Sequence, residues 1–242
     1  MLDNILLENV LILDIETVPG IEDYEQMDDA FKQLWEQKVG RWRKEEELPA
    51  THYFDNAAIY AEFGKVVCIS VGFFVANSNG EWGLRIKSFF GDDERKVLTD
   101  FADLLNQHFG TTNKHYICGH NIKEFDVPYI CRRMLINGLG LPRIIDIAGA
   151  KPWEVRHIDT MQLWRFGDYK HYTSLNLLAC VFGIPTPKDD IQGKDVGRVF
   201  WKDKNLLRIA TYCQKDVVTT ARLLMRFKGI PAVPDEGVTI VG

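Results

Sequence analysis

The sequence has few of the features that mark secreted, membrane-spanning or repetitive proteins. Its 242 residues include only five cysteines, which lie far apart and form no Cys-x-x-Cys pair. This usage is typical of small core residues in a reducing compartment, so we expect a cytoplasmic protein. No apolar run approaches the roughly 20 residues that span a bilayer. The first residues also lack the basic region of a signal peptide, so membrane-spanning and secreted proteins are both disfavoured.

A surplus of positive charge is missing as well. The chain has 29 basic and 34 acidic residues, a net charge of −5. Proteins that hold duplex nucleic acid along its length usually carry a basic surface, because they neutralise several phosphates. The charge argues against tight, non-specific duplex binding, but it suits an enzyme that holds a few nucleotides through metal ions. It leaves open a protein partner that supplies substrate binding, although no residue indicates one.

Hydrophobic residues make up 46% of the chain, which allows a sizeable core. An apolar run from Val10 predicts a buried strand, and residues 65–75 and 82–90 predict a hairpin. Helices and short strands then alternate, so we expect an α/β fold, a mixed sheet with helices packed on its faces. No repeat or linker divides residues 1–242, which we interpret as one domain. We interpret the polar segment at about 21–60 as a helical insertion.

Two short motifs combine carboxylates with regular structure. Asp14 and Glu16 close the first strand, where a period of two puts both side chains on one face. Tyr212 and Asp216 lie four residues apart in the last long helix, so they also share a face. Asp126 follows a short strand and a loop. Other Asp-x-Glu and Tyr-x-x-x-Asp pairs in the sequence lack these contexts.

Carboxylates in such surroundings are costly unless a cation pairs with them. Mg²⁺ and Mn²⁺ prefer carboxylate oxygens. Two such ions, about 3.5–4 Å apart, can stabilise the attacking and leaving oxygens of an in-line displacement. Four acids that converge with a tyrosine therefore favour two divalent ions and phosphodiester cleavage. Solvated surface charge is the alternative interpretation.

The order of these residues resembles a known family. The similar segments are Asp14-Ile15-Glu16-Thr17, Gly119-x-Asn121-x-x-x-Phe125-Asp126 and Tyr212-x-x-x-Asp216, which resemble the three exonuclease motifs of the DEDDy family. The second motif is similar to the proofreading domain of family B DNA polymerases. Residues 174–179 and 183–188 resemble stand-alone relatives of that domain. The resemblance covers residues 9–225 and implies a free-standing 3′–5′ exonuclease with a ribonuclease H-like fold, a mixed five-stranded sheet flanked by helices.

The resemblance implies metal ligands and a catalytic tyrosine. Asp14 would bridge two divalent ions, and Glu16 and Asp216 would complete the site of one of them. Asp126 would hold the other ion. Tyr212 would orient the attacking water, because its phenol is too weakly acidic to act as a strong base near neutral pH. A packing role is the alternative for Tyr212.

The resemblance also implies substrate contacts. Asn121 and Phe125 would contact the last nucleotides of the strand, and the backbone around Thr17 would meet the 3′-hydroxyl. A core aromatic is an equally good interpretation of Phe125, and a turn residue is the alternative for Asn121. We interpret the strand-end pair His157 and Asp159 as structural and leave both out of the site.

The expected reaction is the release of 5′-mononucleotides from a single strand with a free 3′ end, with DNA favoured over RNA. An exoribonuclease or RNA-processing phosphodiesterase with the same site is the alternative, because no residue decides between the two nucleic acids. A non-catalytic nucleic-acid-binding module is disfavoured, since its signature would be the loss of an acid and all four are present.

Overall fold

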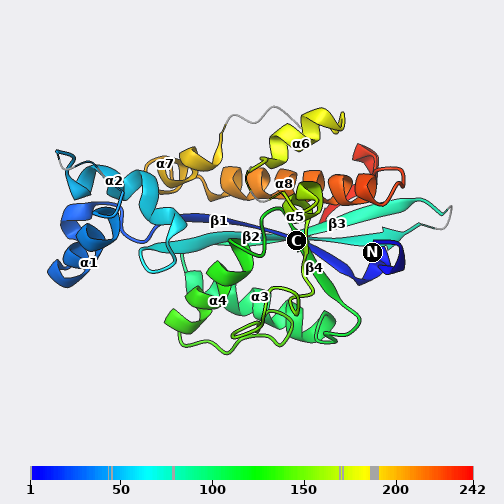
Figure 1. Ribbon diagram of the computed structural model, residues 1–242, viewed down its shortest axis with the longest axis horizontal. Helices are drawn as coiled ribbons and strands as arrows, with labels where there is room; N and C mark the ends of the chain where they lie inside the picture. Colours follow the sequence, from blue (N-terminus) through cyan, green and yellow to red (C-terminus); the bar gives the residue numbers. More distant parts are fainter. Residues whose placement is uncertain are drawn as a thin grey trace.

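The computed structural model describes residues 2–42, 44, 46–77, 80–168, 170, 172–185 and 191–241, so part of the stretch at 183–188 lies outside the described residues. Within these ranges the chain forms one six-stranded mixed sheet of order β5-β4-β1-β2-β3-β6 (Figure 1). The strands are β1 (Val10–Pro19), β2 (Gly64–Ala76), β3 (Trp82–Phe90), β4 (Tyr116–Gly119), β5 (Ile158–Asp159) and β6 (Val238–Val241). The predicted α/β class is confirmed, with a sixth strand where five were expected.

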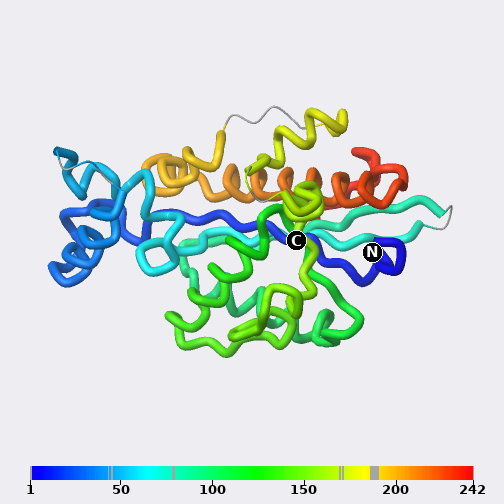
Figure 2. Tube along the Cα trace, in the orientation of Figure 1, coloured from blue at the N-terminus to red at the C-terminus, as the bar shows by residue number. Residues whose placement is uncertain are grey.

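Helices cover both faces of this sheet. The α-helices are α1 (Asp29–Val39), α2 (Pro49–Asn56), α3 (Glu94–His108), α4 (Asp126–Ile136), α5 (Thr160–Arg165), α6 (Leu175–Val181), α7 (Val196–Trp201) and α8 (Leu206–Phe227). The short 3-10 helices are η1 (Leu2–Asn4), η2 (Leu7–Asn9), η3 (Tyr24–Gln26), η4 (Ala57–Ile59), η5 (Gly193–Asp195) and η6 (Asp235–Gly237). Helices α3 and α4 lie on one side of the sheet, while α5, α6, α7 and α8 lie on the other (Figure 1). The tube in Figure 2 follows the same course, with α1 and α2 at one end of the molecule.

Strand β1 lies inside the sheet, with a paired strand along each of its edges. It is antiparallel to β2 and parallel to β4. Leu11, Leu13 and Ile15 belong to the core on the α3/α4 side, whereas Val10 and Ile12 belong to the core beneath α8. The strand therefore has two distinct faces, as the period of two requires.

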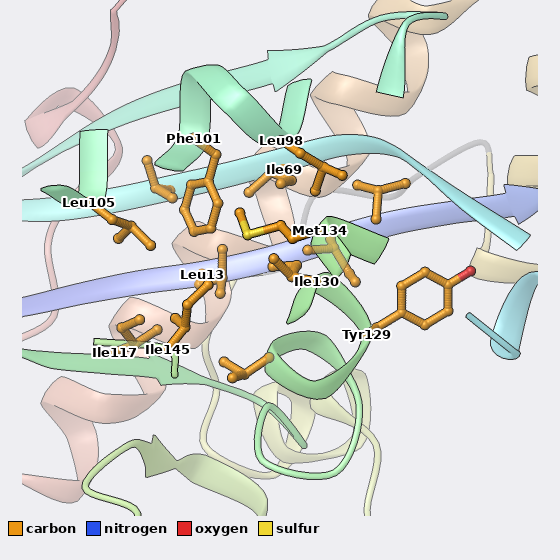
Figure 3. Packing of buried hydrophobic residues seen from close by; sticks show 14 of the residues in the cluster. Leu13, Ile69, Leu98, Phe101, Leu105, Ile117, Tyr129, Ile130, Met134 and Ile145 are labelled. Atoms are coloured by element: carbon orange, nitrogen blue, oxygen red, sulfur yellow. The ribbon is translucent and has the colours of Figure 1, made fainter. Parts of the chain in front are cut away.

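The core on the α3/α4 side is an apolar layer between the sheet and these two helices. Figure 3 shows Leu98, Phe101 and Leu105 of α3 packed beside Ile130 and Met134 of α4. All five side chains are fully buried. This layer fixes the position of α4, whose first residue is Asp126.

The segment at 21–60 holds α1, α2 and a small core of its own around the fully buried Trp35 and Tyr53. The Trp35 indole donates a hydrogen bond to the Pro49 carbonyl at 2.9 Å, which ties α1 to the start of α2. Helix η4 then returns the chain to the sheet. The hydroxyls of Thr17 and Tyr129 both donate to the Ala58 carbonyl at 2.9 Å, so the segment is fastened to β1 and α4.

Candidate active site

Two carboxylates project from β1 on the face that α8 covers. Asp14 and Glu16 continue the alternation of Val10 and Ile12, and Val18 resumes the apolar pattern after them. The pairing of β1 with β2 shifts by one residue between Glu16 and Thr17. Such a bulge increases the local twist and redirects side chains, and bulges are frequent beside active sites. The sequence pattern thus turns from apolar to acidic within one buried strand.

Asp126 approaches the same strand from the first turn of α4. It is buried, and its Oδ1 accepts a hydrogen bond from the Ile15 amide at 3.2 Å. Ile15 separates Asp14 from Glu16, so this bond brings the Asp126 carboxylate beside the two β1 acids. The structure therefore brings together three acids from two motifs that lie more than a hundred residues apart in sequence.

Helix α8 supplies the third motif. The Cys213 thiol donates to Asp14 Oδ2 at 3.2 Å and lies 3.4 Å from the Asp14 carbonyl oxygen, which fixes α8 against β1. The charge of Asp216 raises the pKa values of Asp14, Glu16 and Asp126. A side-chain hydrogen bond also joins Tyr212 to Asp216. All five predicted catalytic residues thus belong to one electrostatic cluster.

The cluster is electrostatically strained as long as it holds only protein atoms. Burial is the largest cause that raises the pKa values of Asp14 and Glu16 well above the ordinary range, and it raises that of Asp126 to about 7. Within the described part of the chain, no lysine or arginine forms an ion pair with these three acids. A divalent cation would remove this cost, and carboxylate oxygens are the donors that Mg²⁺ and Mn²⁺ prefer. The donor set therefore fits hard divalent ions.

Tyr212 is held in its protonated form. Burial is the largest cause that raises its pKa, followed by the charges of Asp216, Glu16 and Asp14. A phenol with a raised pKa donates a hydrogen bond and is a poor base near neutral pH. Tyr212 can therefore orient a polar group above the acids, but it does not accept a proton from that group.

Asn121 lies in the loop between β4 and Asp126. Its φ is +62°, a conformation that is uncommon outside glycine, and its Oδ1 is buried without a hydrogen-bond partner among the described residues. Position 119, two residues earlier, has room only for glycine. A Cβ there would lie 2.7 Å from the Ile122 side chain and 2.9 Å from the Leu13 carbonyl oxygen. Strain and an orphaned acceptor at one residue indicate a functional constraint.

The other two predicted substrate contacts have structural partners. The Thr17 hydroxyl is bonded to the Ala58 carbonyl, so its side chain is committed to the fold. The Phe125 ring lies 5.4 Å from the Tyr129 ring and packs against the core, but it is only partly buried. Phe125 therefore has both a packing role and an accessible surface.

Sequence reasoning missed two side chains of this site. Cys213 was interpreted only as a core cysteine, although it directly follows Tyr212. Tyr172 lies near the acids, since burial and then the charges of Asp126, Asp159 and Asp216 raise its pKa. The segment before α6 carries no motif that could have indicated this position.

Asp159 acts as a support for the site. Its carboxylate accepts hydrogen bonds from the amides of Asn121 (3.0 Å), Lys123 (3.2 Å), Met161 (3.0 Å) and Gln162 (3.2 Å). It thereby caps α5 and holds the loop that leads to Asp126. These bonds agree with the structural interpretation of Asp159, and they show that its role reaches the second motif.

Comparison with known families gives the site a context. Residues 59–235 match the model of a family described as predicted 3′–5′ exonucleases related to the exonuclease domain of PolB. The chain belongs to this family. The matched range contains Asp126, Tyr212 and Asp216, and it begins after Asp14 and Glu16. Membership in this exonuclease family confirms the predicted resemblance and the assignment to the nuclease hydrolases, a class that uses divalent metal ions in general.

The fold of this exonuclease-family chain is also similar to part of a solved polymerase. It is similar to the family B DNA polymerase of the hyperthermophilic archaeon Pyrobaculum calidifontis, with a TM-score of 0.53 and 19% sequence identity. The match covers 90% of this chain and 24% of the polymerase chain. The predicted ribonuclease H-like architecture is confirmed. No protein of curated function matches the chain significantly, and no helix in its described part is long and apolar enough to cross a bilayer.

Proposed function

We propose that this chain is a two-metal 3′–5′ exonuclease that releases 5′-mononucleotides from single-stranded DNA. The observation that carries the proposal is the convergence of Asp14, Glu16, Asp126 and Asp216 on one site. The first three have no cationic partner among the described residues, and their pKa values are raised by burial. An acidic cluster of this kind is costly to maintain unless it serves to hold cations.

The four acids would hold two Mg²⁺ or Mn²⁺ ions, as their oxygen donors favour. When bound, such ions stabilise the charge that develops on the attacking and leaving oxygens of a phosphodiester. Asp14 is suited to serve both ions, because the charges of Asp216 and Asp126 both act on it. Glu16 and Asp216 would then hold one ion, and Asp126 would hold the other.

Tyr212 would orient the attacking water by accepting a hydrogen bond at its phenolic oxygen, since its own proton stays on the ring and is shared with Asp216. Asn121, in the loop of the second motif, would contact the terminal nucleotides, and Phe125 would offer its accessible ring surface to a base. The backbone beside Thr17, where the pairing of β1 with β2 shifts register, would meet the 3′-hydroxyl. A net charge of −5 suits short contacts with a single strand better than a long duplex interface.

The direct test is degradation of a 5′-labelled oligonucleotide offered as single-stranded DNA, duplex DNA and RNA, with Mg²⁺ or Mn²⁺. We expect the single-stranded DNA to shorten as a ladder and to release 5′-mononucleotides. A 3′-terminal phosphate or phosphorothioate should stop the reaction. Cleavage of closed circular single strands at a comparable rate would refute the exonuclease proposal, and faster degradation of RNA would refute the choice of DNA.

A further inference from the structure

A hollow beside the second motif has no part in the catalysis proposed above. It has a volume of about 660 Å³, within the usual range for pockets that hold small ligands. Lys123 and Glu124 of the motif loop form one wall, and Gln162 of α5 forms another. The third wall is the loop at 137–157, which joins α4 to β5 and contributes Trp153. In Figure 1 this loop lies on the α3/α4 side of the sheet, next to β4.

Trp153 is an unusual residue for this position, because its large side chain is 77% exposed. The Lys151 ammonium lies 5.4 Å from the ring centroid, and the indole N–H donates no hydrogen bond within the described ranges. An indole that borders a hollow offers a flat surface on which any nucleobase can stack. A lysine beside it adds favourable charge for a phosphate.

The polar side chains of the hollow are available to a ligand. Among the described residues, neither the Lys123 ammonium nor the Gln162 side-chain amide has a hydrogen-bond partner, although both residues are half-buried. The acidic wall residue Glu124 is paired with Arg165 at 3.4 Å, which reduces its repulsion of a phosphate. The hollow therefore combines a stacking surface, a cation and an amide that can bond a base edge.

The hollow is also fixed relative to the catalytic acids. Asp159 bonds the backbone amides of Asn121 and Lys123 on one side and of Met161 and Gln162 on the other. One buried carboxylate thus holds both the motif loop and α5, which are two walls of the hollow. A strand that contacts Asn121 meets Lys123 two residues further along the same loop.

We propose that this hollow binds an upstream nucleotide of the substrate strand, with its base stacked on Trp153 and a phosphate at Lys123. The inference rests on the proposed single-strand exonuclease function and adds a second site of substrate contact to it. Affinity should therefore increase with strand length until the strand reaches Trp153. The stacking is tolerant of base identity, so the site would confer length preference without sequence preference.

The test measures binding of 5′-fluorescein-labelled oligodeoxythymidylates, from dinucleotide to octanucleotide, by fluorescence anisotropy. It uses the Asp14→Ala background with Mg²⁺ present, so that strands stay intact. We expect Trp153→Ala to weaken octanucleotide binding about 10-fold and dinucleotide binding by clearly less. Trp42→Ala is the matched control, because Trp42 is also an exposed tryptophan (46%) but packs on His52, away from the hollow. It should change octanucleotide affinity less than about twofold.

Lys123→Ala gives an independent readout. It removes the ammonium but keeps the backbone amide that Asp159 holds. If one phosphate sits at Lys123, the slope of log affinity against log salt should become shallower by about 0.7, the value for one phosphate of a single strand. An unchanged slope would contradict the assignment of a phosphate to this lysine.

The inference is overturned if Trp153→Ala weakens all lengths equally, or if the octanucleotide binds as well as before. A competition experiment can also overturn it. Free thymidine 5′-monophosphate that binds the hollow should quench the fluorescence of Trp153, and this quenching should be lost in Trp153→Phe. If the mononucleotide saturates the hollow in this way but does not compete with the octanucleotide, the inference is wrong. Each of these results leaves the exonuclease itself in place. Failure of the wild-type chain to degrade any strand with Mg²⁺ or Mn²⁺ would instead refute the proposed function, so the two failures are distinguishable.

Discussion

The two faces of β1 place opposite demands on neighbouring residues of one strand. The face toward α3 and α4, here the apolar face, carries Leu11, Leu13 and Ile15 in a continuous hydrophobic layer. The face toward α8, here the acidic face, changes from Ile12 to Asp14 and Glu16. The apolar face stabilises the fold by burial, whereas the acidic face costs stability until cations bind. Neighbouring residues such as Leu13 and Asp14 therefore serve the stability of the fold and the proposed chemistry, respectively.

Removal of metal ions should produce the largest difference between the two faces: activity should be lost while the fold remains. Excess EDTA should abolish nuclease activity, and Mg²⁺ or Mn²⁺ should restore it. Ca²⁺ should support little turnover, because the larger ion takes more ligands at longer distances. The apolar layer needs no ion, so far-UV circular dichroism should stay unchanged in EDTA. Full activity in excess EDTA would exclude the metal mechanism.

The paired variants Asp14→Ala and Leu13→Ala test adjacent residues on opposite faces. Asp14→Ala should lower turnover about a thousandfold or more, because its carboxylate serves both ions, while the metal-free fold keeps or gains stability. Leu13→Ala should cost about 2–5 kcal/mol of unfolding free energy but retain turnover per folded molecule. Single-turnover rates and urea titrations measure the two effects. Near-normal turnover by Asp14→Ala would remove the proposed catalytic role of this face.

A smaller effect is expected from two tyrosine variants. Tyr212→Phe should slow the reaction roughly 10- to 1,000-fold, because one oriented hydrogen bond to the attacking water is lost. Tyr129→Phe is the matched control, since its hydroxyl bonds the Ala58 carbonyl from α4. It should cost about 1 kcal/mol of stability and little turnover. If Tyr212→Phe slows the reaction less than about threefold, Tyr212 has only a packing role.

A change of pH tests the acidic face without a substitution at Asp14. The folded pKa of Asp126 is about 7 against an ordinary value of 3.8. The folded protein therefore binds a proton that the unfolded chain has lost, and the free energy of unfolding should fall as pH rises from about 4 to 7. Thermal unfolding in EDTA should show this loss of stability in the wild type and a weaker loss in Asp126→Asn. Mn²⁺ should stabilise the wild type increasingly as pH rises, because bound carboxylates must be deprotonated. Equal slopes of stability against pH for the two proteins would contradict the role given to Asp126.

The sequence predicted the elements whose patterns are long. The continuous apolar run located β1, and the expected last long helix that carries Tyr212 and Asp216 is α8. It did not indicate β6, because Val238–Val241 is a four-residue segment whose pairing with β3 depends on the finished fold. Helices α5 and α7 have six residues each, too few to show a helical period.

The convergence of the four acids could be predicted because each lies in a motif with a defined local structure. The support from Asp159 could not, since it depends on amides 36 and 38 residues away in sequence. The contact between Cys213 and Asp14 likewise joins residues 199 positions apart. Sequence patterns report local periodicity, whereas these contacts arise only when the sheet and α8 are assembled.

The outermost strands of the sheet have a consequence for how the protein behaves at high concentration. β5 has two residues and β6 has four, whereas the inner β1, β2 and β3 have 10, 13 and 9. An exposed strand edge is a template on which a second molecule can add a strand, and short edges offer few hydrogen-bonding groups for this. The outer edges of this sheet therefore give a second molecule few groups on which edge-to-edge aggregation could start.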